Sequence, residues 1–110
     1  MRVLALCLIL VATLCAHAIL KESIPAPRGI VRGPGTEFRL KFNSRIDASR
    51  SRLSVENGGG TRPVRIVAQP SPDTLVGDAN GLQPGPAVLR WQVFAVDGHL
   101  TRGELPFEVR

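Results

Sequence analysis

The amino-acid sequence predicts an all-β domain, an antiparallel β-sandwich or small barrel with Greek-key connections and about seven strands. Three observations predict it. Apolar and polar residues alternate with a period of two along several short runs, and glycine, proline and asparagine separate these runs. No long stretch after the first residues has the apolar period of a helix. At 110 residues the chain has room for one domain.

The first half of the domain contains two clear strands and a hairpin. Residues 38–42 read Phe-Arg-Leu-Lys-Phe, which places three apolar side chains on one face. Residues 53–55 and 64–66 show the same alternation on either side of Asn-Gly-Gly-Gly at 57–60. Because asparagine and glycine tolerate positive φ, this tetrad predicts a turn that joins the two runs into a hairpin.

The second half contains the strongest strand. Residues 69–86 carry four prolines and predict a connection, with a brief strand candidate at 74–76. Residues 88–96 predict a long strand that stops at Asp97-Gly98, and residues 105–109 predict the last strand. The side chains expected to face the core from these two strands are Leu89, Trp91, Val93, Ala95, Leu105, Phe107 and Val109.

The N-terminal residues predict export. Residues 1–16 hold one positive charge, an apolar stretch and then small residues, the layout of a secretory signal peptide. We expect cleavage after Ala16, which leaves a domain of residues 17–110 with no cysteine and no membrane insertion. The triplet Ala16-His17-Ala18 also fits a small-x-small cleavage pattern, and a cut after Ala18 would discard His17.

The charge of the chain argues against a nucleic-acid partner. The formal net charge is +5, and twelve of the 14 basic residues are arginines scattered along the chain. A dense basic run and tyrosine are both absent, so the sequence lacks the aromatic stacking platform that single-stranded nucleic acids need. We interpret the arginines as a solvated surface and expect a monomer.

Two histidines and one aspartate are the candidate metal ligands. Cleavage after Ala16 would give His17 a free α-amine beside its imidazole, so one residue could offer two nitrogen donors. His99 would add a third nitrogen, and Asp97 a carboxylate oxygen. Such a set suits Cu(II), which stands at the top of the divalent affinity order. The competing interpretation stays open, because Asp-Gly is first of all a turn signal and a histidine after it is often only exposed.

Several motifs resemble the CopC copper-resistance family nearly from end to end of the mature chain. The most specific is Trp-Gln-Val-Phe-Ala-Val-Asp-Gly-His at 91–99, followed by Gly-Glu-Leu-Pro-Phe at 103–107. Shorter matching elements are His-Ala-Ile-Leu at 17–20, Ser-Ile-Pro-Ala-Pro at 23–27, the strand at 38–42 and Leu-Gln-Pro-Gly at 82–85. Each element is weak alone, and the combination is specific.

The resemblance implies an immunoglobulin-like β-sandwich that lies in the periplasm and binds one Cu(II) ion per chain through an N-terminal histidine brace. In that arrangement His17 supplies its amine and one imidazole nitrogen, His99 the other imidazole, and Asp97 a carboxylate near or on the metal. Some relatives add a methionine-rich Cu(I) site. This chain has only Met1, which leaves with the leader. A CopD-type membrane copper importer is the partner that the resemblance implies.

The expected function is therefore copper sequestration, resistance or trafficking without catalytic turnover. One alternative is a small oxidative enzyme, because a histidine brace resembles the copper site of polysaccharide monooxygenases. The small size and the lack of a flat aromatic surface argue against it. The other alternative is a structural sandwich that binds no metal.

Overall fold

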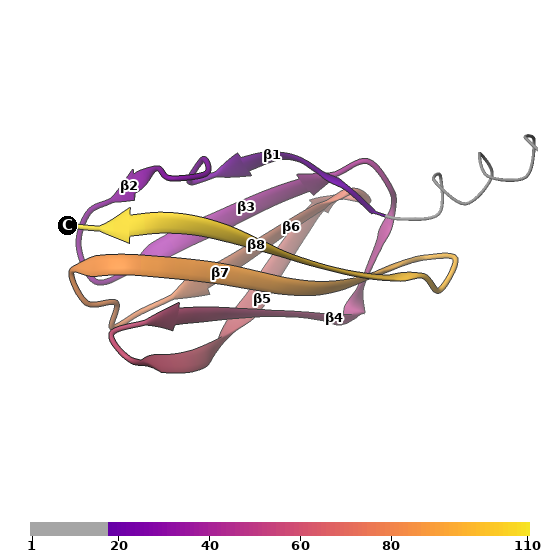
Figure 1. The fold of residues 1–110 in the computed structure, drawn as a ribbon. Coiled ribbons are helices and arrows are strands. Elements are labelled where there is room, and N and C mark those ends of the chain that lie inside the picture. The colour runs from indigo at the N-terminus through magenta and orange to yellow at the C-terminus, as the bar shows by residue number, and fades with distance from the viewer. Residues whose placement is uncertain (1–17) are drawn as a thin grey trace, which may run out of the picture.

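The computed structural model describes residues 18–110, and this part of the chain consists of β-strands joined by turns (Figure 1). The all-β prediction is confirmed, with eight strands where about seven were expected. The strands are β1 (Leu20–Ile24), β2 (Ile30–Val31), β3 (Thr36–Phe42), β4 (Ile46–Asn57), β5 (Gly60–Ser71), β6 (Thr74–Ala79), β7 (Gly85–Ala95) and β8 (Leu100–Val109). Residues 18–110 contain no helix that is long and apolar enough to cross a membrane. The predicted leader and His17 lie outside the described residues.

The eight strands form one curled sheet in the order β1-β3-β6-β5-β4-β7-β8-β2. β5 joins the two layers, because its first residues pair with β4 (Leu53 opposite Val64) and its later residues pair with β6 (Arg65 opposite Asp78). Figure 1 shows the two layers facing each other, with β3 and β6 in one and β4, β7 and β8 in the other. Every pairing is antiparallel except that of the short β2 with β8.

Side chains that alternate along the long strands fill the space between the layers. The expected inward residues of β3, β7 and β8 are all buried, each with at most 8% of its surface exposed. Two edge-to-face ring contacts connect the layers, Phe38 with Phe107 at 5.5 Å and Phe42 with Trp91 at 6.1 Å between centroids. Because full burial of one large apolar side chain contributes about 1.5–3 kcal/mol, these contacts supply much of the stability of a domain without disulfides.

Two parts of the fold differ from the sequence prediction. The stretch 69–86 was expected to be a connection with a brief strand candidate at 74–76. That candidate is confirmed as part of β6, which runs to Ala79 and lies between β3 and β5 at the centre of its layer. Thr74, Leu75, Val76 and Gly77 are all buried, so the strand lacks the alternation by which strands are recognised. β1 and β2 were not predicted because they are short edge strands with mostly exposed or half-exposed side chains.

Close packing in the β7–β8 hairpin requires glycine at position 103. Trp91 and Gly103 are directly opposite each other in the register, and the indole lies over the glycine. A Cβ atom added to Gly103 would come within 2.3 Å of Cζ2 of Trp91, far inside van der Waals contact. The tryptophan therefore keeps its buried position only while residue 103 has no side chain.

We predict that Gly103→Ala destabilises the domain by about 1–3 kcal/mol, because the methyl group forces the indole or the strand to shift. Gly60→Ala is the matched control, since a Cβ there meets no atom within 4 Å. Urea denaturation followed by the fluorescence of Trp91 measures both variants. Equal stability of the two alanine variants would show that the Trp91 site tolerates the added methyl group.

Candidate metal centre

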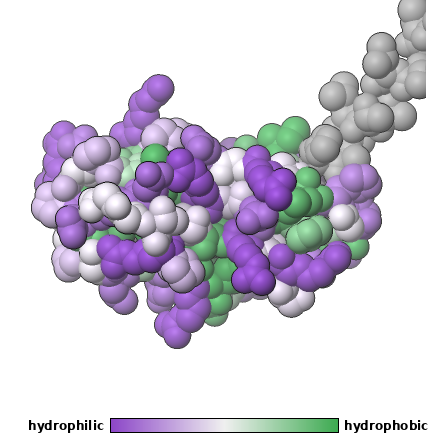
Figure 2. Space-filling model, turned by 60° about the horizontal axis from the view of Figure 1, so that its bottom comes forward, coloured by the Kyte–Doolittle hydropathy of each residue, from purple (hydrophilic) through white to green (hydrophobic). Residues whose placement is uncertain are grey.

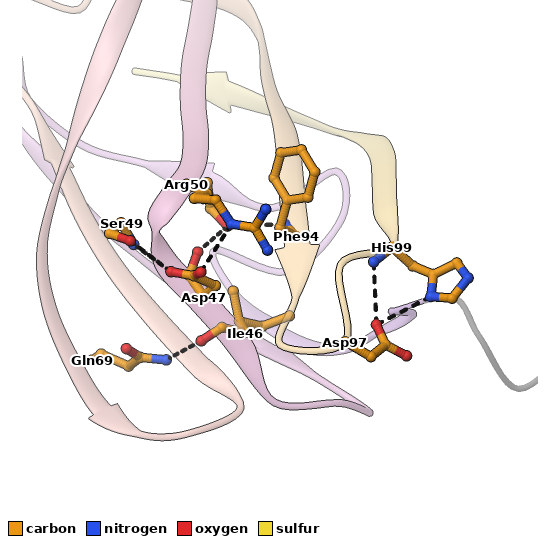
Figure 3. Close-up of polar contacts among 9 residues, drawn as sticks. Ile46, Asp47, Ser49, Arg50, Gln69, Phe94, Asp97 and His99 are labelled. Carbon is orange, nitrogen blue, oxygen red and sulfur yellow. Dashed lines mark hydrogen bonds and ion pairs between the residues drawn. The ribbon is translucent and has the colours of Figure 1, made fainter.

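The β7–β8 turn carries the two predicted ligands that the structure describes, Asp97 and His99 (Figure 3). The turn closes because the Gly98 N–H donates to the Ala95 carbonyl at 2.9 Å and the Ala95 N–H donates to the His99 carbonyl at 2.9 Å. Gly98 has φ of 96°, in the region that glycine adopts at no steric cost. The predicted role of Asp97-Gly98 as a turn is thus confirmed.

Asp97 and His99 contact each other directly. Oδ1 of Asp97 lies 3.1 Å from Nδ1 of His99 and accepts a hydrogen bond from the His99 backbone N–H at 3.2 Å. Both contacts are visible in Figure 3, with the imidazole directed away from the sheet. The two side chains are about half exposed, at 57% for Asp97 and 53% for His99. Solvent and ions can therefore reach the pair.

The hydrogen bonds lower the pKa of Asp97 below its ordinary value of 3.8. The largest cause is the bond from the His99 backbone N–H, followed by the contact with the His99 side chain. Both favour the ionised carboxylate. Asp97 is thus ionised at neutral and mildly acidic pH. A carboxylate must be ionised to bind a metal or to orient an imidazole that binds one.

A contact between Nδ1 and a carboxylate also affects the imidazole. When Nδ1–H donates to a carboxylate, the other ring nitrogen, Nε2, carries the lone pair that a metal requires. Metal-binding histidines usually have such a partner, which fixes both the tautomer and the ring orientation. The chemistry of the Asp97–His99 pair therefore suits a site in which His99 binds the metal and Asp97 orients it.

The start of the described chain is anchored at the same end of the molecule. Ala18 is buried, with 2% of its surface exposed, and its N–H donates to Oγ1 of Thr101 at 3.2 Å. The next residue, Ile19, is held by Asn43, because its N–H donates to Oδ1 of Asn43 at 2.7 Å and its carbonyl accepts from the Asn43 N–H at 2.9 Å. Sequence reasoning missed Thr101 and Asn43, and neither stands in a motif that could have revealed it.

A bulge in β4 supports the end of β7 next to the turn. The register between β4 and β7 shifts between Asp47 and Arg52. Within this bulge Ser51 accepts a hydrogen bond from the Phe94 N–H at 3.0 Å, and the Arg50 guanidinium lies 4.7 Å from the Phe94 ring centroid. In Figure 3 the Asp47 carboxylate, below that ring, accepts hydrogen bonds from the Arg50 guanidinium and the Ser49 hydroxyl. The strand that leads into Asp97 is therefore fixed by side-chain contacts as well as by its ladder.

Asp97 and His99 supply only part of a metal site. Among residues 18–110, no group of three or more histidine, cysteine, aspartate or glutamate side chains gathers in a way that could hold an ion. His17, the third predicted ligand, lies outside the described residues, so its place in the site stays a prediction.

The fold and this hairpin define a class of protein, a small Greek-key β-sandwich domain with an imidazole–carboxylate pair on an exposed turn at one end. Comparison with known families identifies it further: the CopC domain matches residues 20–110. The chain belongs to the CopC family, which confirms the resemblance found in the sequence.

Three relatives illustrate the match. Protein YobA of Escherichia coli K12 is 28% identical over 99 residues, which cover 86% of this chain and 80% of YobA. The crystal structure of CopC from Methylosinus trichosporium OB3b is 26% identical, with a TM-score of 0.74 over 84% of this chain and 93% of that one. PcoC from Escherichia coli, described as a methionine-rich copper resistance protein, shares the fold at 22% identity, with a TM-score of 0.69 over 86% of this chain and all of PcoC.

We predict that His99→Ala raises the pKa of Asp97 in the metal-free protein but leaves it below 3.8. The variant loses the imidazole contact and keeps the backbone N–H, which is the larger cause of the lowered value. Because a lowered carboxylate pKa stabilises the fold above the ordinary value, this contribution is lost as the pH falls through the lowered value.

Carboxyl ¹³C chemical shifts followed against pH measure this change. Asp73 is an internal control, because its pKa is lowered by Ser71 and Thr74 and should not respond to the substitution. An Asp97 titration that is identical in the variant would show that the imidazole does not act on this carboxylate.

Proposed function

We propose that this protein binds one Cu(II) ion per chain and serves in copper sequestration, resistance or trafficking, without catalytic turnover. The ligands in this proposal are the α-amine and imidazole of His17 and the imidazole of His99, with Asp97 beside or on the metal. Membership of the CopC family supports it, as does the fold shared with PcoC, a copper resistance protein by description. The proposal places the protein in the periplasm after removal of residues 1–16.

The observation that carries the proposal is the anchoring of Ala18 beside the hairpin. Thr101, which accepts the Ala18 N–H, is two residues beyond His99 along the chain. Because consecutive Cα atoms are about 3.8 Å apart, a histidine joined to Ala18 starts close to that end of β8. The anchor therefore supports a site that combines the first residue of the mature chain with a turn some eighty residues later.

The burial of Ala18 also bears on the cleavage site. A cut after Ala18 would remove a side chain that belongs to the hydrophobic core and a hydrogen bond to Thr101. A cut after Ala16 keeps both contacts and leaves His17 with a free amine. The packing therefore favours the cut after Ala16, in agreement with the family resemblance.

The available donors favour Cu(II) over Cu(I). The chain has one methionine and two cysteines, and all three precede His17. With thioether and thiolate donors removed, the mature protein offers nitrogen and oxygen donors, which suit Cu(II) rather than the softer Cu(I). The exposure of Asp97 and His99 suits exchange of the metal, since an acceptor can reach the site without opening the core. A CopD-type importer is the acceptor that the family resemblance suggests.

We predict that His99→Ala weakens Cu(II) binding by at least 100-fold, whereas Asp97→Asn weakens it about 10- to 100-fold. The first change removes a donor, and the second removes a partner that orients that donor. Copper titration of the processed protein, with a competing chelator and electron paramagnetic resonance spectra, measures affinity and stoichiometry. Glu37→Gln, at an exposed position of β3, is the matched acid-to-amide control. Unchanged affinity in His99→Ala would refute the site, and tight Cu(I) binding would refute the donor assignment.

We predict that blocking the α-amine of His17 removes most of the copper affinity. A single additional residue before His17 converts the amine into an amide, which at neutral pH does not offer the same lone pair. Protein beginning at His17 and protein extended by one glycine are compared in the same titration. Equal affinities, or exported protein whose intact mass shows a start at Ile19, would exclude the brace.

We predict that Thr101→Val weakens copper binding about two- to tenfold, while Thr101→Ser restores it. Valine keeps the shape of threonine but cannot accept the Ala18 N–H, and one hydrogen bond contributes about 0.5–1.5 kcal/mol. A changed paramagnetic resonance spectrum in Thr101→Val distinguishes a displaced N-terminus from a general loss of stability. If threonine, serine and valine give the same affinity and spectrum, the anchor does not position the site.

A further inference from the structure

A cleft of about 860 Å³ lies outside the candidate metal centre and is lined by residues of β4, β5, β7 and β8. It forms where β5 leaves β4 for the other layer after Val64 and where β4 bulges between Asp47 and Arg52. Figure 2, which looks onto the lower side of the molecule in Figure 1, shows apolar surface at its middle between two polar shoulders. Clefts of about 300–1,000 Å³ are typical of sites for small ligands or short chain segments.

Arginines dominate the polar lining of the cleft. Four arginines line it, Arg52, Arg62, Arg90 and Arg102. Arg90 is neutralised by Glu56 and by Glu104, the carboxylate that also lines the cleft.

The other three arginines are not paired with any carboxylate that the structure describes. The Arg62 guanidinium donates to the backbone carbonyls of Asn80 and Gly81 at 3.1 and 2.7 Å, which engages two of its N–H groups without neutralising its charge. Arg52 and Arg102 are exposed and form no ion pair with any residue that the structure describes.

The sheet register brings Arg52 and Arg102 to one position of the cleft. Arg52 is opposite Gln92 across β4 and β7, and Gln92 is opposite Arg102 across β7 and β8. Since neighbouring strands lie about 4.8 Å apart, the two arginine backbones are about 10 Å apart with an amide side chain between them. This row offers cationic donors and an uncharged amide to a ligand that crosses the strands.

The apolar part of the lining is small. Leu53, Val64 and Trp91 border the cleft, but they are at most 8% exposed and belong to the core. Ile66, which also borders the cleft, is half-buried. The combination of Ile66 and cationic donors fits a ligand that carries both carboxylates and an aliphatic side chain.

We propose that this cleft is a docking site for an acidic segment of a partner protein, with carboxylates on Arg52 and Arg102 and an apolar side chain against the half-buried Ile66. Arginine clusters recognise acidic segments through paired, charge-assisted hydrogen bonds. The chain itself is a poor source of the occupant, because residues 1–16 contain no acidic residue and a second copy shares the net charge of +5. The proposal does not depend on the copper site.

The cleft lies near the end of the β7–β8 hairpin that carries Asp97 and His99. Arg102 follows His99 by three residues on the path into β8, which corresponds to about 10 Å along an extended chain. A segment seated in the cleft would hold its parent protein beside the Asp97–His99 turn. The cleft would then act as a recognition surface for a protein that approaches the exposed end of the domain.

The test uses the processed protein kept metal-free with EDTA, so that its result is independent of copper binding. The probe is an acetylated and amidated hexapeptide in which glutamate alternates with leucine. A fluorescent dye attached to the peptide reports its binding by fluorescence anisotropy. The comparison peptide has glutamine in place of glutamate, and citrate is the free anion.

Two double variants separate the cleft from general charge. R52Q/R102Q removes the two arginines of the row, and R32Q/R39Q removes two exposed charges outside the cleft. We expect saturable binding of the glutamate peptide, at least tenfold weaker in R52Q/R102Q and less than twofold weaker in R32Q/R39Q. The glutamine peptide should bind at least tenfold more weakly, and raised salt should weaken the glutamate peptide by screening.

Three results would overturn the proposal. The first is no saturable binding of the glutamate peptide to the unmodified protein. The second is an equal loss in both double variants, which would indicate attraction to net charge alone. The third is citrate that binds as tightly as the peptide and displaces it, which would make the cleft a small-anion site rather than a docking surface.

Discussion

The pairing of β7 with β8 is the interaction on which the rest of the structure depends. Ten consecutive residue pairs join these strands, from Gly85 opposite Val109 to Phe94 opposite Leu100. The hairpin supplies a large share of the core, including the Trp91 ring, which fits because Gly103 has no side chain. Its turn holds Asp97 and His99, its second strand holds the anchor for Ala18, and its outer face contributes arginines to the cleft.

The two-residue period of the hairpin explains why one element can serve the core and the surface together. Inward positions of β7 and β8 are apolar and buried, whereas Arg90, Gln92 and Arg102 alternate with them and face outward. A shift of one residue in the register would exchange the two sets and place charged groups in the core. The core therefore fixes the register, and the register in turn fixes where the turn and the arginine row lie.

The candidate metal centre shows how a small domain can build a site without a deep pocket. Asp97 and His99 are half exposed, yet the imidazole is oriented by a carboxylate two residues away and by a turn that only glycine closes without strain. Thr101 and Asn43 hold the backbone of residues 18 and 19 at the same end. Each of these hydrogen bonds contributes modestly, about 0.5–1.5 kcal/mol, but together they fix the backbone of residues 18 and 19. A preorganised but exposed arrangement fits the proposed role, in which the site holds an ion and releases it.

The sequence by itself determined the local features: the strands at 38–42, 88–96 and 105–109, the hairpin at 57–60, the Asp97-Gly98 turn and the motifs of the CopC family, because each depends on neighbours along the chain. It indicated only residues 74–76 of β6, whose buried residues lack alternation, and it did not reveal the short β1 and β2, whose strand character comes from pairing with β3 and β8. Only the tertiary structure decided that Ala18 is anchored to Thr101, 83 residues away, and that Arg52 and Arg102 share one row across β7. Such contacts join residues distant in sequence, and the physical reason they escape sequence analysis is that strand order and register are set by the packing of the whole core, not by any one segment.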